Sequence, residues 1–288
     1  MLRRYHSYMS QPQIAPMNVS SYQSPSELAA QVASLPPPRQ LLLFGDSITQ
    51  GASSLQSELS RRYVRRLDVL NRGFGGYNTN SALTLLPSFF PAVAPSRTVP
   101  RVAAMTVHFG ANDSCSPGEP QHCDLDRFKT NVRRILNWEG VRLHKTKVLL
   151  VTPSPVEEYR LPHDGKGRAD RVAMYADAIR DIGKQENVPV VDLWTAMMRT
   201  ANWKGDAVDG ILPGSSRTVP SMELGRLFYD GLHLNQEGYG IYTEELLRVL
   251  EAEVPECRIE GTDEWYPEWI RFHPPAASRV VEDDSRLA

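Results

Sequence analysis

Short apolar runs alternate with longer amphipathic segments along most of the chain. The runs that have the length of buried strands are Gln40–Phe44, Leu67–Asn71, Val102–Phe109, Lys147–Thr152 and Pro189–Leu193. Apolar residues at helical spacing predict helices at Glu58–Arg65, Thr79–Leu86, Leu125–Trp138, Ala169–Glu186 and Gln236–Ala252. Such alternation is typical of a parallel sheet covered by helices on both faces. The pattern predicts an α/β protein with a three-layer α/β/α, flavodoxin-like fold and a five-stranded parallel sheet of order 2-1-3-4-5.

The two ends of the chain depart from this alternation. We expect residues 1–38 to be a flexible extension with one short helix, because Ser24 and Glu27 have capping-box spacing and three prolines end the segment. Residues 39–254 then form the main domain. Residues 255–288 form a C-terminal tail, and its aromatic side chains indicate that part of it packs on the main domain.

A long segment that contains several prolines and glycines, residues 203–229, precedes the last predicted helix. Loops of this length often carry function. We expect a shaped loop without a further helix, which forms one wall or lid of a substrate pocket. The apolar side chains expected near the pocket mouth are Ile211, Leu212, Val219, Met222, Leu224, Leu227 and Phe228.

Composition and charge narrow the class of protein. The 288 residues are 41% hydrophobic and 23% charged, which is close to the globular average and excludes wholesale disorder. A formal charge of −2 gives no electrostatic basis for gripping nucleic acid, and no apolar run is long enough to cross a bilayer. A small molecule is therefore the expected partner, and a homodimer is left open.

The cysteines indicate the compartment. The chain has three cysteines, Cys115, Cys123 and Cys257, and a small, odd number does not form a disulfide framework. The sequence therefore predicts reduced thiols in the cytoplasm. The first residues contain arginine and serine and no acid before Glu27, so a mitochondrial transit peptide is the weaker alternative.

Residues able to perform chemistry follow the first three predicted strands. Ser47 follows the first, Gly76 the second and Asn112 the third. In a 2-1-3 order these loops are neighbours at the carboxyl edge of the sheet, where open α/β sheets bind ligands. Asp230 and His233 stand just before the last helix, and a carboxylate three residues before a histidine can fold back and orient the imidazole.

These residues predict nucleophilic catalysis. Ser47 is the nucleophile, His233 the general base and Asp230 the group that orients it. The Ser47 N–H, the Gly76 N–H and the Asn112 side-chain amide are the candidate oxyanion-hole donors. Taken alone, Ser47 would more often be a helix N-cap. Its combination with the other four residues favours the catalytic interpretation.

Four ordered segments carry a resemblance to a known family: Gly45-Asp46-Ser47, Gly76, Gly110-x-Asn112-Asp113 and Asp230-x-x-His233. They are similar to the conserved sequence blocks of the GDSL/SGNH hydrolases. Their residues most resemble those of the isoamyl acetate-hydrolysing esterase branch. The resemblance spans about residues 40–250. It implies the SGNH hydrolase fold, no metal or organic cofactor, the five site residues in the roles given above, and lipase-like hydrolysis of short-chain esters, above all acetyl esters, in lipid degradation.

Other functions remain open at this point. An acyltransferase or deacetylase would use the same scaffold, and a non-catalytic scaffold would bind acylated molecules without turnover. The glycines from Gly73 to Gly76 lack the spacing of a dinucleotide-binding loop. His108, Cys115 and His122 lie near one another in the sequence, but neither they nor their neighbours have a zinc-ligand spacing.

Overall fold

The computed structural model describes residues 24–90, 92–161, 167–205, 210–260 and 264–266. Residues Pro36–Trp265 belong to one compact unit, and helix α1 (Pro25–Ser34) belongs to a second unit. The predicted capping box of α1 is confirmed, because the Ser24 side chain accepts from the Glu27 N–H and the Glu27 carboxylate accepts from the Ser24 N–H. The remaining parts expected as an extension and a tail, residues 1–23 and 267–288, lie outside the described residues.

The main unit is built on a five-stranded parallel sheet, as predicted. Its strands are β1 (Gln40–Gly45), β2 (Asp68–Gly73), β3 (Val102–His108), β4 (Lys147–Val151) and β5 (Val190–Val191). Their order is β2-β1-β3-β4-β5, and every pairing is parallel. Gly45 pairs with Gly73 on one side and with His108 on the other, so the first three strands end at the same level. The loops that follow them therefore start side by side.

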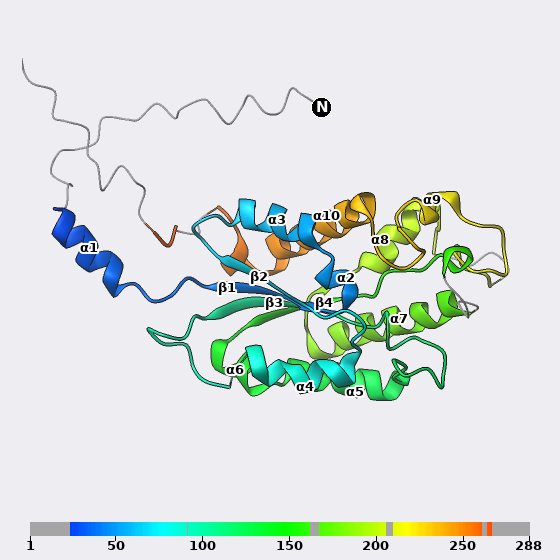
Figure 1. Ribbon diagram of the computed structural model, residues 1–288, viewed down its shortest axis with the longest axis horizontal. Helices are drawn as coiled ribbons and strands as arrows, with labels where there is room; N and C mark the ends of the chain where they lie inside the picture. The colour runs from blue at the N-terminus through cyan, green and yellow to red at the C-terminus, as the bar shows by residue number, and fades with distance from the viewer. Residues whose placement is uncertain (1–23, 91, 162–166, 206–209, 261–263, 267–288) are drawn as a thin grey trace, which may run out of the picture. The chain divides into compact units, whose positions relative to one another are not determined.

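Helices cover both faces of this sheet (Figure 1). One face carries α3 (Ser53–Arg62), α8 (Leu193–Thr200) and α10 (Gln236–Glu253). The other face carries α4 (Thr79–Phe89), α5 (Leu125–Leu136), α6 (Glu139–His144) and α7 (Arg168–Glu186). The short helices α2 (Ser47–Gln50) and α9 (Met222–Gly225) complete the unit, with 3-10 turns at Glu158–Arg160 and Pro255–Cys257. Among the helices that the structure describes, none is long and apolar enough to cross a membrane.

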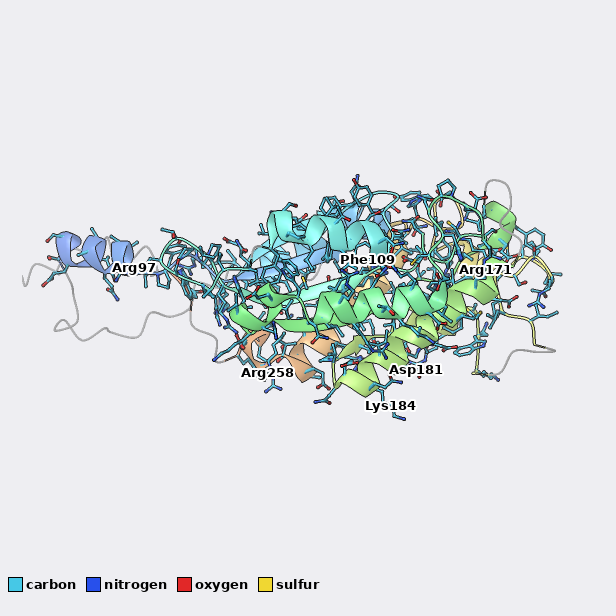
Figure 2. The ribbon with its side chains drawn as sticks, turned by 90° about the horizontal axis from the view of Figure 1, so that it is seen from below. Arg97, Phe109, Arg171, Asp181, Lys184 and Arg258 are labelled. Atoms are coloured by element: carbon cyan, nitrogen blue, oxygen red, sulfur yellow. The ribbon has the colours of Figure 1, made fainter. Side chains whose placement is uncertain are left out.

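Alternating side chains of the strands build two apolar cores. In β1, Leu41 and Leu43 belong to the core under α3, α8 and α10, whereas Leu42 and Phe44 belong to the core under α4, α5 and α7. This division follows from the two-residue period of a strand. Phe109, just beyond β3, is buried, while Asp181 and Lys184 lie exposed on α7 (Figure 2).

Several predicted boundaries were wrong. The helix expected at Glu58–Arg65 is α3, which begins at Ser53 behind a residue without a side-chain cap and ends before Arg65, whose φ of 60° is left-handed. The helix expected at Leu125–Trp138 ends at Leu136, and α6 follows it. The last predicted strand keeps only two residues, because Asp192 caps α8.

The segment 203–229 also differs from its prediction. It contains the short helix α9, which Ser221 caps by accepting from the Leu224 N–H. Leu224, Leu227 and Phe228 are buried in the core rather than placed at a pocket mouth, and Val219 and Met222 point into solvent. Residues 206–209 lie outside the described part of the chain.

The described part of the C-terminal tail belongs to the main unit as far as Trp265. The Cys257 side chain is buried in the core under α10. The Trp265 N–H donates to the Arg65 carbonyl, and the Trp265 indole N–H donates to the Pro36 carbonyl at 2.8 Å. These bonds tie the tail to the segments that enter β2 and β1.

Candidate active site

Ser47 lies at the point where β1 turns into α2. Asp46 is the N-cap of α2, because its Oδ1 accepts from the Ile48 N–H at 2.9 Å. The Ser47 hydroxyl is therefore not used as a cap and is available for other bonds. Gly45 is required just before it, since a Cβ there would lie 2.1 Å from Thr49 Oγ1 and 2.5 Å from the His108 carbonyl oxygen.

The Ser47 hydroxyl meets a histidine that comes from a distant part of the chain. His233 Nε2 lies 3.0 Å from Ser47 Oγ, and His233 Nδ1 lies 2.7 Å from Asp230 Oδ2. The other Asp230 oxygen accepts from the backbone N–H groups of Leu232 and His233, so the carboxylate closes its own turn. All three side chains that sequence reasoning combined are in hydrogen-bond contact.

The turn from Asp230 to His233 is fixed by close packing. Gly231 has a φ of 90°, and a Cβ on it would lie 2.4 Å from the Glu157 carbonyl oxygen. The Gly231 carbonyl accepts from the Glu157 N–H at 2.9 Å, and the Tyr229 N–H donates to the His233 carbonyl. Glycine is thus needed at this position for both its backbone conformation and its contact.

The electrostatics keep Asp230 ionised. Partial burial alone would raise its pKa, but hydrogen bonds from the His233 side chain and from the two backbone N–H groups outweigh this and lower the pKa below the ordinary 3.8. The side chains of His233 and Asp230 are 43% and 45% exposed, so the pair opens to solvent and to an incoming substrate.

The glycine turn after β2 adjoins Ser47 and is bonded to Asn112. The residues Phe74 to Tyr77 form a β-turn in which the Tyr77 N–H donates to the Phe74 carbonyl, and Gly76 has the φ of 80° that a type II turn requires at its third position. A Cβ on Gly75 would lie 3.9 Å from the Ser47 Cβ, so this turn adjoins the serine. Asn112 joins it through Nδ2, which donates to the Tyr77 carbonyl at 2.8 Å.

The N–H donors of Ser47, Gly76 and Asn112 can still form hydrogen bonds to a ligand. Within the described residues, the N–H groups of Ser47 and Gly76 make no hydrogen bond, and the Asn112 amide uses one proton on Tyr77. N–H groups left unpaired beside a nucleophile can bind the negative oxygen of a tetrahedral intermediate.

Two buried carboxylates support the loops of the site. Asp46 holds the start of α2, and Asp113 Oδ1 accepts from both the N–H and the hydroxyl of Thr79 at the start of α4. Burial raises the pKa of Asp46 to about 7 and that of Asp113 to about 6. Their contacts therefore identify both carboxylates as hydrogen-bond acceptors that shape these loops.

A pocket of about 440 Å³ opens next to the serine. Its lining combines hydroxyl and amide groups with a few apolar surfaces and consists of Ser47, Gly51, Ser53, Ser54, Tyr229, His233, Leu234, Gln236 and Tyr239. Of the described residues in segment 203–229, only Tyr229 is in this lining. The wall that we expected from that segment is thus formed mainly by α3 and the start of α10.

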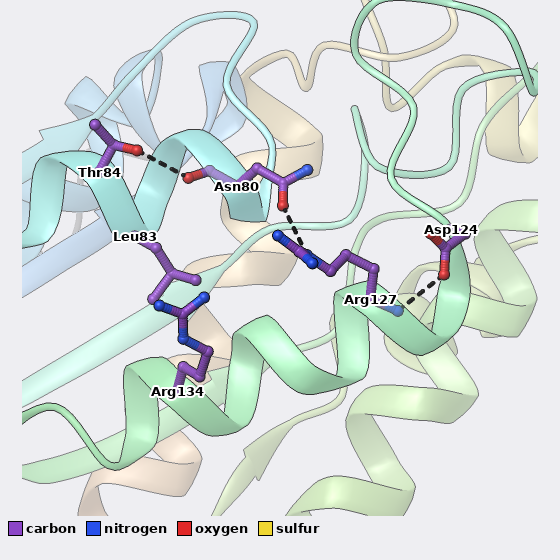
Figure 3. A pocket seen from close by; sticks show the side chains of 6 residues that line it. All are labelled: Asn80, Leu83, Thr84, Asp124, Arg127 and Arg134. Atoms are coloured by element: carbon purple, nitrogen blue, oxygen red, sulfur yellow. Dashed lines mark hydrogen bonds between the residues drawn. The ribbon is translucent and has the colours of Figure 1, made fainter.

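A second pocket, of about 570 Å³, lies between α4 and α5 (Figure 3). Its Asn80 accepts from Arg127 Nε and from Asn131 Nδ2, and Asn131 also donates to Thr79. It shares no lining residue with the pocket at Ser47. These bonds brace the start of α4, which follows the glycine turn.

The cysteine and histidine residues near Asp113 serve packing and hydrogen bonding. His122 Nδ1 contacts the Cys115 carbonyl at 2.8 Å, and Cys123 Sγ accepts from Thr79 and Asn131. Burial lowers the pKa of His108 to about 3, and its ring packs edge-on against Tyr242. Among the residues described, no three histidine, cysteine or acidic side chains are grouped so as to hold a metal ion.

Sequence reasoning missed two glutamines of the site. Gln50 Oε1 accepts from the Gly75 N–H at 2.5 Å, and Gln121 Nε2 donates to the Gly76 carbonyl at 2.9 Å. Neither glutamine belongs to a sequence motif that would predict a role in the site. Only the folded chain brings them to the glycine turn.

Comparison with known proteins identifies the family. The sequence pattern of the GDSL-like Lipase/Acylhydrolase family matches residues 43–241. A GDSL esterase/lipase of Arabidopsis thaliana is 32% identical over 75% of this chain and 87% of its own length. The isoamyl acetate-hydrolyzing esterase of Saccharomyces cerevisiae is 28% identical over 86% of this chain and 98% of its own.

Solved structures agree with this fold. A lipase/acylhydrolase from Enterococcus faecalis has a TM-score of 0.53 at 23% identity and covers 74% of this chain and 96% of its own. An acetylxylan esterase from Geobacillus stearothermophilus has a TM-score of 0.54 at 19% identity, over 81% and 99% of the two chains. The chain belongs to the GDSL-like lipase/acylhydrolase family, has the SGNH hydrolase fold, and is a carboxylic ester hydrolase rather than a non-catalytic scaffold.

Proposed function

We propose that the enzyme hydrolyses short-chain esters, above all acetyl esters, through Ser47, His233 and Asp230. The observation that carries this proposal is the continuous pair of contacts from Ser47 Oγ to His233 Nε2 and from His233 Nδ1 to Asp230 Oδ2, at 3.0 and 2.7 Å. A serine hydroxyl is a weak nucleophile until a base takes its proton, and His233 stands at the distance needed for that transfer.

In the acylation step, Ser47 Oγ attacks the carbonyl carbon of the ester as His233 Nε2 takes the hydroxyl proton. Asp230 holds the Nδ1 proton and stabilises the imidazolium that forms. The carbonyl oxygen becomes negative and is bound by the N–H groups of Ser47 and Gly76 and by the Asn112 amide. The C–O bond to the alcohol part of the ester then breaks as His233 gives its proton to that oxygen. The alcohol departs, and the acyl group remains bound to Ser47 Oγ.

Deacylation repeats the same steps with water. His233 takes a proton from the water molecule, whose oxygen attacks the acyl carbon, and the same donors bind the oxygen. The proton returns to Ser47 Oγ as the carboxylic acid departs. The sequence balances with the ester and one water molecule, because His233 passes the Ser47 proton to the departing alcohol and a proton from water back to Ser47 Oγ.

Two observations favour short acyl chains. The pocket at Ser47 has about 440 Å³, which is near the lower end of the range of about 300–1,000 Å³ for ligand sites. The Saccharomyces cerevisiae relative is named for its hydrolysis of isoamyl acetate, an acetyl ester. An acyltransferase would need a second alcohol in the same pocket, so the product must be identified directly.

We place the enzyme in the cytoplasm as part of the same proposal, and lipid degradation is its expected context. The support for the compartment is that Cys115, Cys123 and Cys257 are all buried, unpaired thiols. Reduced cysteines of this kind are typical of intracellular proteins.

The test compares the wild-type chain with Ser47→Ala on p-nitrophenyl esters from acetate to palmitate. We expect activity to be highest on the shortest esters and to be lost in Ser47→Ala, while a fluorophosphonate labels only the wild type. Product analysis with added isoamyl alcohol separates hydrolysis from acyl transfer. Full activity of a correctly folded Ser47→Ala protein would refute the assignment of the nucleophile.

A further inference from the structure

The glycine turn that supplies one oxyanion donor is held from both sides by glutamines. Gln50, the last residue of α2, accepts from the Gly75 N–H at 2.5 Å. Gln121, from the loop before α5, donates to the Gly76 carbonyl at 2.9 Å. Between these two bonds stands the one peptide unit whose N–H belongs to Gly76, and that N–H makes no hydrogen bond within the described residues.

The chemistry of each bond is fixed by the backbone group that it uses. A backbone N–H can only donate and a carbonyl can only accept, so Gln50 must present its oxygen and Gln121 its NH₂. The structure has this arrangement: Gln50 Oε1 faces the Gly75 N–H, and Gln121 Nε2 faces the Gly76 carbonyl. The two glutamines are therefore complementary in role, although they are the same residue type.

Further bonds hold Gln121 itself in place. Its backbone carbonyl accepts from Asn78 Nδ2 at 2.9 Å, and its Oε1 accepts a weak bond from Cys115 Sγ at 3.8 Å. A Cβ on Gly76 would lie 3.1 Å from Gln121 Nε2, so this amide also fills the space beside the turn. Gln121 is thus a fixed support against which the turn rests.

The turn has reason to need such support. Glycine adopts positive and negative φ with similar ease, so two successive glycines leave the orientation of the Gly76 N–H weakly determined by the backbone alone. The oxyanion hole works only when its donors already point at the position that the negative oxygen will take. A donor that must be reoriented during the reaction stabilises the transition state less.

We propose that Gln50 and Gln121 are positioning residues that clamp the Gly75–Gly76 turn and so aim the Gly76 N–H at the oxyanion. This inference rests on the proposed function, because it assigns the two glutamines to the oxyanion hole of that reaction. Neither side chain bonds to the substrate. Both act through the backbone groups of the turn.

The test replaces each glutamine by methionine, which has a similar length and neither donor nor acceptor of comparable strength. The purified full chain hydrolyses p-nitrophenyl acetate, and kcat is calculated per serine titrated to completion with a fluorophosphonate. Because the Gly76 N–H acts mainly on the transition state, kcat should fall roughly 10- to 100-fold in Gln50→Met and in Gln121→Met, with KM unchanged within about twofold.

Gln56→Met is the matched control. Gln56 Nε2 also donates to a backbone carbonyl, that of Val69, at 3.1 Å, but it does not touch the glycine turn. It should keep the wild-type kcat and KM. A loss of kcat in Gln56→Met equal to that in Gln121→Met would show a general effect on the fold and would overturn the clamp.

A second variant keeps the proposal testable where methionine prevents folding. Gln121→Glu has the same shape but places an oxygen against the Gly76 carbonyl, so it should lose kcat at least as strongly as Gln121→Met. Wild-type kcat in folded Gln50 and Gln121 variants, or a change in KM alone, would overturn the clamp. The proposed function fails separately, if the fluorophosphonate does not label Ser47 in the wild-type chain.

Discussion

Asp46 makes the stability of the enzyme depend on pH, and Asp46→Asn tests this. The carboxyl is 1% exposed, Oδ1 accepts from the Ile48 N–H, and Oδ2 has no partner in the described part of the chain. Burial, reinforced by the neighbouring Asp113, raises the pKa of Asp46 from 3.8 to about 7, although the bond from Ile48 opposes the shift. An asparagine keeps an oxygen for the Ile48 N–H and cannot ionise.

The magnitude follows from this shift. Between about pH 4 and pH 7 the folded chain still holds a proton on Asp46 that the unfolded chain has released, so the free energy of unfolding must fall as the pH rises through this window. A pKa shift from 3.8 to about 7 lowers the free energy of unfolding by about 4 kcal/mol once the pH has risen above about 7. Asp46→Asn removes this loss, so its stability should change less with pH than that of the wild type.

Urea unfolding of both proteins at several pH values from 4.5 to 8 measures the effect. The difference in unfolding free energy, Asp46→Asn minus wild type, should rise with pH by about 2 to 4 kcal/mol across the series. Asp181→Asn, at an exposed position on α7, is the control and should run parallel to the wild type. Parallel curves for Asp46→Asn and the wild type would refute the reasoning.

Three further substitutions test the site. Asn112→Ala removes an oxyanion donor and should lower kcat by roughly 10²- to 10³-fold with little change in KM, whereas a raised KM at constant kcat would make Asn112 a ground-state contact. Asp230→Asn should lower kcat by about 10³- to 10⁴-fold in steady-state assays, because the histidine then loses its orienting acceptor; near-normal kcat would exclude that role for Asp230. Gly231→Ala should cost about 1–3 kcal/mol in urea unfolding, since the new Cβ meets the Glu157 carbonyl. Gly240→Ala, where a Cβ has open space within α10, should not destabilise the fold, and equal losses in the two variants would contradict the packing argument.

The middle of the sheet could be predicted because strands β1, β3 and β4 are buried on both faces. All seven residues of β3, from Val102 to His108, are buried, so the strand reads as one apolar run. Strands β1 and β4 are buried in nearly the same way, whereas the edge strand β2 is buried at Val69 only. The fifth strand, β5, is two residues long because the cap of α8 follows it directly. The strand order was predicted as the flavodoxin-like order that five strands in such an alternation favour.

Two of the missed helix starts lack a local capping signal, and the misplaced apolar side chains of segment 203–229 reflect tertiary packing. Helix α3 begins at Ser53 behind Ala52, which makes no capping bond, and α6 begins at Glu139 behind Trp138, which makes none either. The apolar side chains near Leu227 were assigned to a pocket mouth, because a run of apolar residues in a loop does not reveal which surface it covers. In the folded chain they complete the core under α10.

The site contains one contact between residues close in the sequence and one between residues far apart in it. Only the first can be predicted from residue spacing. The spacing of Asp230 and His233 determines their contact, since one turn of backbone brings the two together. The contact of His233 with Ser47, 186 residues away, depends on packing. Phe228 and Leu234 flank the turn from Asp230 to His233, form a β-bridge with each other, and are both buried, which anchors the turn in the core. Tyr239 of α10 donates its hydroxyl to the Ile48 carbonyl at 2.7 Å, one residue beyond the nucleophile. The distance between base and nucleophile is therefore set by apolar burial and by one tyrosine, neither of which belongs to the sequence motif.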